Sequence, residues 1–481
     1  MQPYQILILI AAYFGLLFLV SFFSSRAGSN AEFFRANRES PWYIVAFGMI
    51  GASLSGVTFI SLPGTVATDS FSYFQVVLGY TVGYAVIGLI LLPLYYRLNL
   101  TSIYSYLESR FGKYSYKTGA SFFLLSRIVG SSFRLFLVAN VLQLILFDEL
   151  GVPYYATVSA TIFLIWLYTF RSGIKTVVWT DTLQTFFMLL SLGVTLIVVS
   201  DELGITAGRM INHLSESGLT KIFFFEDWKS SDHFIKQFVS GAFIAIVMTG
   251  LDQDMMQKNL TCRNLKDAQK NMFSFTIVLT IVNMMFLILG VLLTQYADLS
   301  GIDAIKDELF PAIATGGELG IGVAILFILG LIAAAYSSAD GTLTALTTSF
   351  SIDILNIEKR YEEAKQMRIR KQIHIVISIL FIAVMLIFKY AIADKSVINK
   401  LFEFAGYTYG PLLGLYTLGL FTNIKVKDKL VPIVAILAPV LSYIISINSL
   451  VWFGFEFGFF ILILNGFLTL LGLILIRTKH H

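Results

Sequence analysis

The sequence predicts an all-α polytopic membrane protein with about thirteen transmembrane helices. Of its 481 residues, 57% are hydrophobic and only 13% are charged, and the mean hydropathy is +0.78. A soluble globule of this size needs far more polar surface than that. Apolar runs long enough to cross a bilayer recur along the whole chain, and two of them are interrupted by small and polar residues. These observations exclude a soluble protein.

The predicted spans follow from counting apolar runs of about eighteen or more residues and allowing for polar interruptions. Their approximate limits are 4–23, 42–62, 73–97, 116–147, 153–170, 176–200, 234–257, 272–295, 318–351, 371–389, 398–421, 429–447 and 450–476. The first run lacks a basic segment and a cleavage pattern, so we expect a retained helix rather than a signal peptide. The single Cys262 excludes an intramolecular disulfide and a thiolate metal cluster.

The distribution of basic residues predicts the orientation of the chain. With the N-terminus outside, most of the 34 Lys and Arg residues fall in inside segments. These segments are 24–41, 97–117, 171–175, 258–270, 359–371, 425–429 and the C-terminal end. By the positive-inside rule we expect the N-terminus outside and the C-terminus inside a plasma or inner membrane. The net charge of +4 is then a topology signal and gives no support to nucleic-acid binding.

Two spans are interrupted at similar depth. The second span carries small and hydroxylated residues through 48–61 and ends in Pro63-Gly64, and the seventh is polar from Thr249 to Asp254. Because they are five spans apart, they take corresponding places in two five-helix units of opposite orientation, 42–200 and 234–421. Helix 4–23 then precedes the repeats and two helices in 429–476 follow them. Paired broken helices in inverted repeats mark the binding site of secondary transporters.

The run from Ala333 to Thr342 predicts a cation site. It places the hydroxyls of Ser337 and Ser338 and the carboxylate of Asp340 in the middle of an apolar span. Ionisable groups at membrane depth are costly and usually face an ion, a partner or water. Serine hydroxyls are oxygen ligands for a hard cation, and the neighbouring alanines let another helix approach closely.

Three further charged residues have two readings each. Asp181 is either an interfacial residue or a partner of Asp340. Arg127 and Arg134 are seven residues apart and share a helix face. They either bind an anionic solute or offset nearby carboxylates, and the sequence favours neither reading.

Taken together, these residues resemble the sodium/solute symporter family over nearly the whole chain. The family includes sodium-coupled transporters of sugars, sialic acid, proline, pantothenate, monocarboxylates and iodide. The matching pieces are 30–38 with Pro41-Trp42, the broken second span, Trp179-Thr180-Asp181 with Gln184, Gln253-Asp254 with Gln257, and Ser337-Ser338. The resemblance implies a LeuT-type five-plus-five inverted-repeat fold with broken helices.

The resemblance also implies sodium sites. The family's site between the second and ninth spans maps onto the carbonyls of Gly51, Leu54 and Ala334 and the hydroxyls of Ser337 and Ser338. Five neutral oxygens suit a monovalent ion, since calcium sites gather carboxylates. Some members hold a second sodium on the aspartate that matches Asp181 and on further serines. Here Asp340 and Gly341 stand in place of those serines. Asp181 and Asp340 are therefore the expected second cation site, with a shared proton or an arginine partner as alternatives.

The implied activity is symport of sodium and a small organic solute by alternating access. The expected solute contacts are Ser55 and Thr58 on the second span, with Met248, Gly250 and Asp252 facing them from the seventh. Whether the solute is an anion or a sugar stays open. The alternatives are an iodide-type transporter or sensor on the same fold and, with less support, an intramembrane enzyme. No phosphate loop or HExxH motif occurs, so a nucleotide-driven pump and a zinc protease are not indicated.

Overall fold

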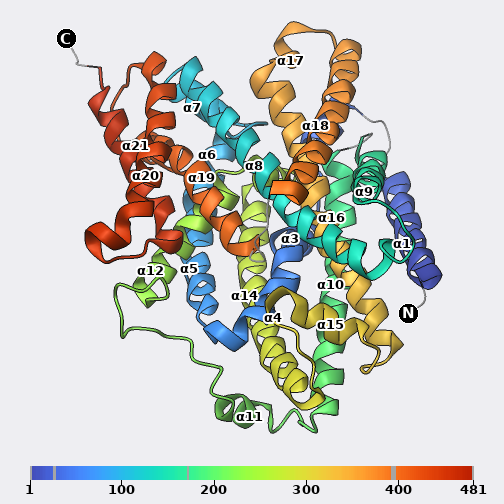
Figure 1. The fold of residues 1–481 in the computed structure, drawn as a ribbon. Coiled ribbons are helices and arrows are strands. Elements are labelled where there is room, and N and C mark those ends of the chain that lie inside the picture. Colours follow the sequence, from blue (N-terminus) through green and yellow to red (C-terminus); the bar gives the residue numbers. More distant parts are fainter. Residues whose placement is uncertain (1–2, 25–28, 171–172, 392–396, 479–481) are drawn as a thin grey trace.

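The protein is a bundle of long helices in a computed structural model that describes residues 3–24, 29–170, 173–391 and 397–478 (Figure 1). Within these ranges no strand forms, and the extended pairing is limited to two isolated bridges, Ser40 with Cys262 and Val426 with Arg477. The all-α prediction is confirmed for the described residues.

Every predicted span coincides with a helix or with a group of consecutive helices. In chain order these are α1 (Pro3–Ser24), α3 (Trp42–Ser53) with α4 (Gly56–Asp69), α5 (Tyr73–Val86) with η2 (Ile87–Leu91) and α6 (Leu92–Arg97), α8 (Lys113–Leu142) with η3 (Gln143–Phe147), α9 (Tyr154–Thr169), α10 (Ile174–Glu202), α12 (Phe234–Ala245) with η4 (Ile246–Gly250) and α13 (Gln253–Asn259), α14 (Leu265–Ser300), α16 (Ile321–Ser349) with η6 (Phe350–Ile354), α18 (Glu363–Ala391), α19 (Val397–Phe421), α20 (Val431–Phe453) and α21 (Ile461–Leu475).

Short helices connect the spans. They are α2 (Asn30–Arg35), η1 (Ala36–Arg38), α7 (Ser105–Arg110), α11 (Met210–Glu216), η5 (Lys306–Glu308), α15 (Leu309–Thr315), α17 (Ile357–Arg360), η7 (Asp428–Leu430) and η8 (Gly458–Phe460). Among the described residues, nine helices are long and apolar enough to cross a membrane, or up to eleven if each bent pair is one span. Thirteen therefore remains a prediction.

One predicted boundary is wrong. The sequence places the start of the last span at residue 450, but α20 runs on to Phe453 and the turn follows at Gly454, whose φ of 59° suits a helix C-terminus. The last helix begins only at Ile461. The count of apolar runs misses this turn because five phenylalanines in 452–460 outweigh the turn signals of Gly454, Glu456 and Gly458.

Both interrupted spans are bent where the sequence predicts. The bend between α3 and α4 is 54°, and the bend between η4 and α13 is 70°. At the second break, Asp252 caps α13 by accepting the backbone N–H groups of Asp254 and Met255. At the first, a Cβ on Gly56 would lie 2.4 Å from Cγ2 of Val138 in α8, so a larger residue requires that side chain to move. The second break is therefore stabilised by a local cap, and the first by close packing against a distant helix.

The broken helices lie at the centre of the bundle. The first pair packs against α14, α10 and α16, while α1 lies at one side of the molecule, against α9, α10 and α16 (Figure 1). On the opposite side, α20 and α21 pack against each other and against α19 (Figure 1). The additional helices are thus peripheral to the broken ones.

One pair of helices is in direct backbone contact. A Cβ on Gly79 of α5 would lie 2.0 Å from the carbonyl oxygen of Phe238 in α12. A Cβ on Gly241 of α12 would lie 2.1 Å from the carbonyl oxygen of Val76. Small residues allow this spacing in membrane helices, and here glycine is required at both positions.

Candidate functional site

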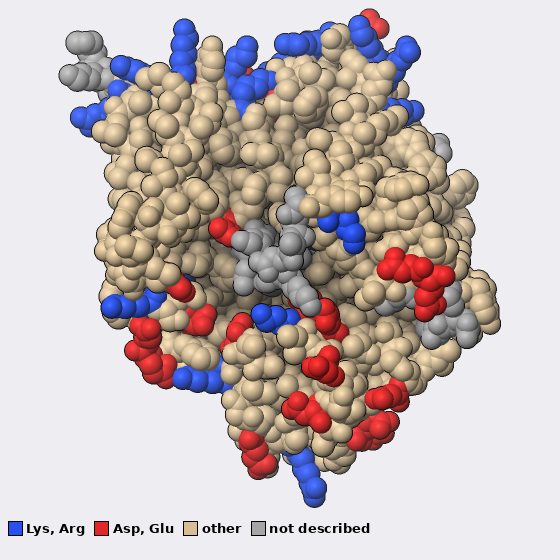
Figure 2. Space-filling model, in the orientation of Figure 1, with Lys and Arg blue, Asp and Glu red and all other residues tan. Residues whose placement is uncertain are grey.

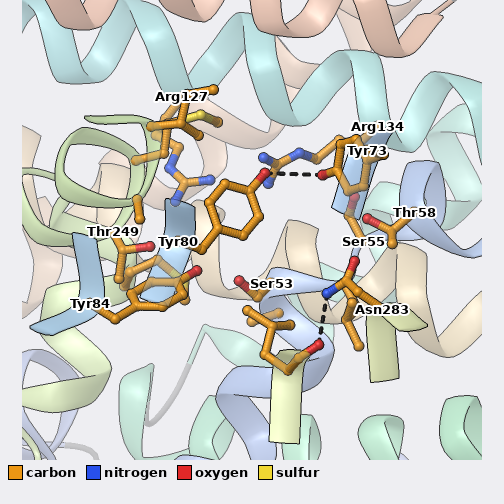
Figure 3. A pocket seen from close by; sticks show the side chains of 17 residues that line it. Ser53, Ser55, Thr58, Tyr73, Tyr80, Tyr84, Arg127, Arg134, Thr249 and Asn283 are labelled. Atoms are coloured by element: carbon orange, nitrogen blue, oxygen red, sulfur yellow. Dashed lines mark hydrogen bonds between the residues drawn. The ribbon is translucent and has the colours of Figure 1, made fainter. Parts of the chain in front are cut away.

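A polar cavity lies beside the two breaks (Figure 3). The space that water-sized molecules can occupy in it is about 70 Å³, so the cavity is narrow in this conformation. Polar side chains from six helical segments line it: Ser53, Ser55, Thr58, Tyr73, Tyr80, Tyr84, Arg127, Arg134, Thr249 and Asn283. Apolar contacts come from α12, η4, α13 and α14, including Ile244, Met248, Met255 and Leu279. The cavity therefore combines hydrogen-bonding groups with apolar walls.

The structure brings together most of the residues that the sequence assigns to the solute. Ser55, Thr58, Arg127, Arg134 and Met248 line the cavity. Gly250 and Asp252 do not belong to this lining, so their placement differs from the sequence-based expectation.

Both residues have other tasks. Gly250 lies against Leu91 and Ile87, and its carbonyl accepts the hydroxyl of Tyr95 at 2.8 Å. Asp252 caps α13 and is fully buried. At the break Gly250 faces η2 and the carboxylate of Asp252 faces Arg127 and the first turn of α13, while Met248 and Thr249 before the break and Met255 after it line the cavity.

Arg127 is held by carboxylates of the seventh span. Its Nε and Nη2 donate to the two carboxylate oxygens of Asp252 at 2.6 and 2.7 Å, and Nη2 lies 3.6 Å from Asp254. Tyr409 of α19 also donates to Asp252. A bidentate pair of this kind is strong and directional. Arg127 thus offsets buried carboxylates, which is one of its two predicted readings, although the partners are Asp252 and Asp254 rather than Asp181 and Asp340.

Arg134 is different. Its Nη1 donates to the hydroxyl of Ser338 at 3.2 Å, and its Nε is buried without a hydrogen-bond partner among the described residues. Within the same residues it forms no ion pair. Figure 3 shows its guanidinium beside Tyr73 and Tyr80, whose hydroxyls are 3.0 Å apart. The cavity therefore contains a cation with unused donors.

The groups expected at the first sodium site lie where the first break meets α16. Helix α3 ends at Ser53, and the last carbonyls of a helix have no intrahelical partner. Helices α3 and α4 both pack against α16, and the chain at Gly56 approaches the backbone of Ala335. Ser337 and Ser338 are buried in this interface.

The carboxylate of Asp181 lies in the same interface. The Ser337 hydroxyl donates to its Oδ1 at 2.6 Å. Its Oδ2 lies 2.8 Å from the ammonium of Lys258, which is also 3.6 Å from Oδ1 of Asp254. The side chains of Asp181 and Lys258 are each 1% exposed, so Asp181 is part of a buried ion pair rather than an interfacial residue.

Asp340 has a separate set of partners. Its Oδ2 accepts the hydroxyls of Tyr168 at 2.9 Å and Thr180 at 3.3 Å, and its Oδ1 accepts the backbone N–H of Gly341. Thr180 adjoins Asp181 in α10, so both carboxylates face the α10–α16 interface. No described arginine pairs with either of them.

The sequence interpretation missed Lys258. We assigned it to an inside loop, 258–270, where it contributed to the positive-inside count. It lies instead in α13, and every residue of that helix is buried. The sequence feature that could have indicated its burial is its position just after the polar break. A short helix that follows a bend can turn back into the bundle and bury such a lysine. The tyrosines of α5 were also missed, because they occur in an ordinary apolar span.

Comparisons with known proteins agree with this arrangement. A sequence model of the sodium:solute symporter family matches residues 33–425. The sodium/sialic acid symporter NanT of Aliivibrio fischeri is 26% identical over 95% of this chain and 91% of its own length. The sodium/sialic acid symporter SiaT of Proteus mirabilis is 26% identical over 87% of this chain and 85% of its own length. The human sodium/iodide cotransporter is 24% identical over 82% of this chain and 61% of its own length.

Solved structures show the same fold. A substrate-bound, outward-open sodium-coupled sialic acid symporter superposes with a TM-score of 0.82 at 20% identity, and covers 99% of both chains. The closed form of Mhp1, a nucleobase-cation-symport-1 family transporter, gives a TM-score of 0.58 at 16% identity, with 93% of this chain and 94% of its own covered. The chain therefore belongs to the sodium:solute symporter family, and it is a multi-pass secondary active transporter that couples sodium to a small solute, not an enzyme.

Proposed function

We propose that the transported solute is a small organic anion whose acidic group binds Arg134. The observation that carries this proposal is the contrast between the two arginines of α8. Arg127 forms a bidentate ion pair with Asp252, whereas Arg134 has no described carboxylate within ion-pair distance and a buried Nε without a partner. A partly buried guanidinium without an anion is costly, and an anionic solute supplies the missing charge.

The remaining cavity lining specifies the body of the solute. Hydroxyl groups of Ser53, Ser55 and Thr58, the tyrosines of α5 and the amide of Asn283 surround the space next to Arg134 (Figure 3). Such groups favour an acid that carries hydroxyls or amides of its own. The relatives named above carry sialic acid or iodide, and others are monocarboxylate transporters, all of which take anions.

The first sodium ion binds, in this proposal, to the carbonyls of Gly51, Leu54 and Ala334 and the hydroxyls of Ser337 and Ser338. Neutral oxygens at a helix end suit a monovalent cation.

Ser338 links this site to the cavity because its hydroxyl also accepts from Arg134. Sodium and Arg134 are both positive, so a solute anion on Arg134 reduces their repulsion. Sodium then raises the affinity for the anion, and the anion raises that for sodium by the same factor.

Orientation and location complete the proposal. Figure 2 shows Lys and Arg along the edge of the molecule where the C-terminus lies and Asp and Glu mostly towards the other end. This separation supports an inside C-terminus and an outside N-terminus in a plasma membrane. The inverted repeats are proposed to comprise 42–200 and 234–421, with 4–23 before them and 429–476 after them.

A ligand screen tests the solute class. We expect acidic sugars such as sialic acid, or short hydroxylated carboxylates, to raise the thermal stability of the purified chain in sodium but much less in choline. Neutral sugars matched in size are the controls. Sodium-dependent stabilisation by a neutral sugar, with none by any acid, would contradict the anion proposal and leave sodium coupling intact.

Replacing either serine by alanine tests the sodium site. We expect Ser337→Ala and Ser338→Ala each to weaken sodium binding by about 1–3 kcal/mol, the cost of losing one oxygen partner of a buried polar group. The readout is the sodium concentration that half-saturates thermal stabilisation. Ser349→Ala, in the same helix but outside the proposed site, is the control. An unchanged sodium dependence in both variants would remove these serines from the site.

A further inference from the structure

The chain carries a cation of its own at the place where the sequence suggests a second sodium. Lys258 projects from α13, and its ammonium lies 2.8 Å from Oδ2 of Asp181 and 3.6 Å from Oδ1 of Asp254. All three side chains are at most 3% exposed. This cluster does not include Asp252, the main partner of Arg127. Asp254 is the residue that the two groups share.

Asp181 has both carboxylate oxygens engaged. Oδ1 accepts the hydroxyl of Ser337 at 2.6 Å, and Oδ2 faces Lys258. A sodium ion on Oδ2 would have to occupy the place of the ammonium or lie next to it. Two cations in contact inside a low-dielectric interior repel each other strongly. The ammonium of Lys258 therefore already balances the charge of Asp181, although neither its Nζ nor Oδ2 of Asp181 has a hydrogen-bond partner among the described residues.

The helix opposite is shaped around the ammonium. A Cβ on Gly341 would lie 2.7 Å from Nζ of Lys258 and 2.6 Å from Oδ1 of Asp254. A serine at 341, which would add a hydroxyl ligand, does not fit while Lys258 is in place. Asp340 forms no ion pair among the described residues, and its oxygens accept from Tyr168, Thr180 and the Gly341 N–H instead. Both observations assign this space to the lysine.

We infer that Lys258 is a built-in cation that occupies the second cation position at Asp181, so that the chain binds a single sodium ion per transport cycle. The inference rests on the proposed first sodium site. The sequence suggests that Asp181 and Asp340 share a second sodium ion. In this inference Asp181 pairs with a tethered ammonium instead. A tethered charge is always present, so this position needs no ion from solution.

Counting bound sodium tests the inference without any solute. Equilibrium binding of radioactive sodium to the purified full-length chain is expected to reach one ion per chain with a hyperbolic curve. Lys258→Met removes the ammonium, keeps the length of the side chain and leaves Asp181 unpaired. This variant is expected to bind two ions per chain, and its thermal stability is expected to depend more steeply on sodium than that of the parent.

The double variant Lys258→Met with Asp181→Asn is the matched control. It removes both charges, so it is expected to fold and to bind one sodium ion. Two ions bound to the parent would overturn the inference, as would one ion bound to a folded Lys258→Met. If Lys258→Met alone does not fold, the parent count decides: one ion supports the inference and two overturn it. A parent that binds no sodium would instead contradict the proposed first site.

Discussion

Replacing Arg127 by glutamine is expected to destabilise the folded protein by about 3–5 kcal/mol, the usual cost of removing one partner of a buried ion pair. The variant leaves the carboxylate of Asp252 buried without the two hydrogen bonds at 2.6 and 2.7 Å that it accepts from Arg127. Asp252 also caps α13, so the geometry of the second break depends on it. Thermal unfolding of the detergent-solubilised protein, followed by its monodispersity, measures the effect.

A compensating change separates charge from geometry in this experiment. Asp252→Asn introduced together with Arg127→Gln removes the unpaired carboxylate and keeps the cap, since asparagine is also a good N-cap residue. We expect the double variant to recover part of the lost stability. An Arg127→Gln protein as stable as the parent, with reduced solute binding only, would show that Arg127 contacts the solute and does not hold the break.

The same substitution at Arg134 is expected to have the opposite signature. Arg134→Gln should leave folding almost unchanged, because Arg134 donates only to Ser338 among the described residues, and it should not weaken sodium-induced stabilisation, because it removes a positive charge next to the proposed sodium site. Its affinity for the anionic solute should fall by about 2–5 kcal/mol, the cost of truncating one partner of a buried charge pair. The measurement is sodium-dependent stabilisation by the best acid from the screen.

Arg127→Gln and Arg134→Gln act as controls for each other, since they make the same chemical change two helical turns apart on α8. Retained acid binding in Arg134→Gln would contradict the proposed role of this arginine. A collapse of folding in Arg134→Gln would contradict it as well, since the residue would then be part of the scaffold. Neither outcome would contradict the proposed sodium site at Ser337 and Ser338.

The fold was predictable because each membrane-spanning segment has to be apolar, and this requirement is visible in the sequence. Long apolar runs, the small residues at the first break and the polar stretch at the second are local signals, and the structure has helices and bends at those places. The turn at Gly454 was missed because the phenylalanines around it lengthen the apolar run, although Gly454, Glu456 and Gly458 together are a turn signal. Hydropathy indicates where a helix can be, and glycines and charges are needed to locate where it ends.

The partners within the site were harder to predict. Arg127 and Asp252 are 125 positions apart, and nothing near Arg127 in the sequence distinguishes it from Arg134. Their different roles arise only when α13 turns back into the bundle and places Asp252 beside one arginine. Lys258 was missed for the same reason. A lysine at the end of a span normally lies at the membrane surface, and only the tertiary structure shows that this one is buried. The charges were visible in the sequence, but their pairing depends on tertiary structure.

The glycine contacts between α5 and α12 have a mechanical consequence. Two helices whose backbones touch at Gly79 and Gly241 cannot slide past each other without driving carbonyls into main-chain atoms, so they move as one rigid lever. That lever carries Tyr73, Tyr80 and Tyr84 on α5 and Ile244 on α12, one whole wall of the cavity. Arg134 belongs to α8, outside this pair. The aromatic wall and the guanidinium therefore belong to separate elements of the bundle, so a movement of α5 with α12 relative to α8 would change the distance between them.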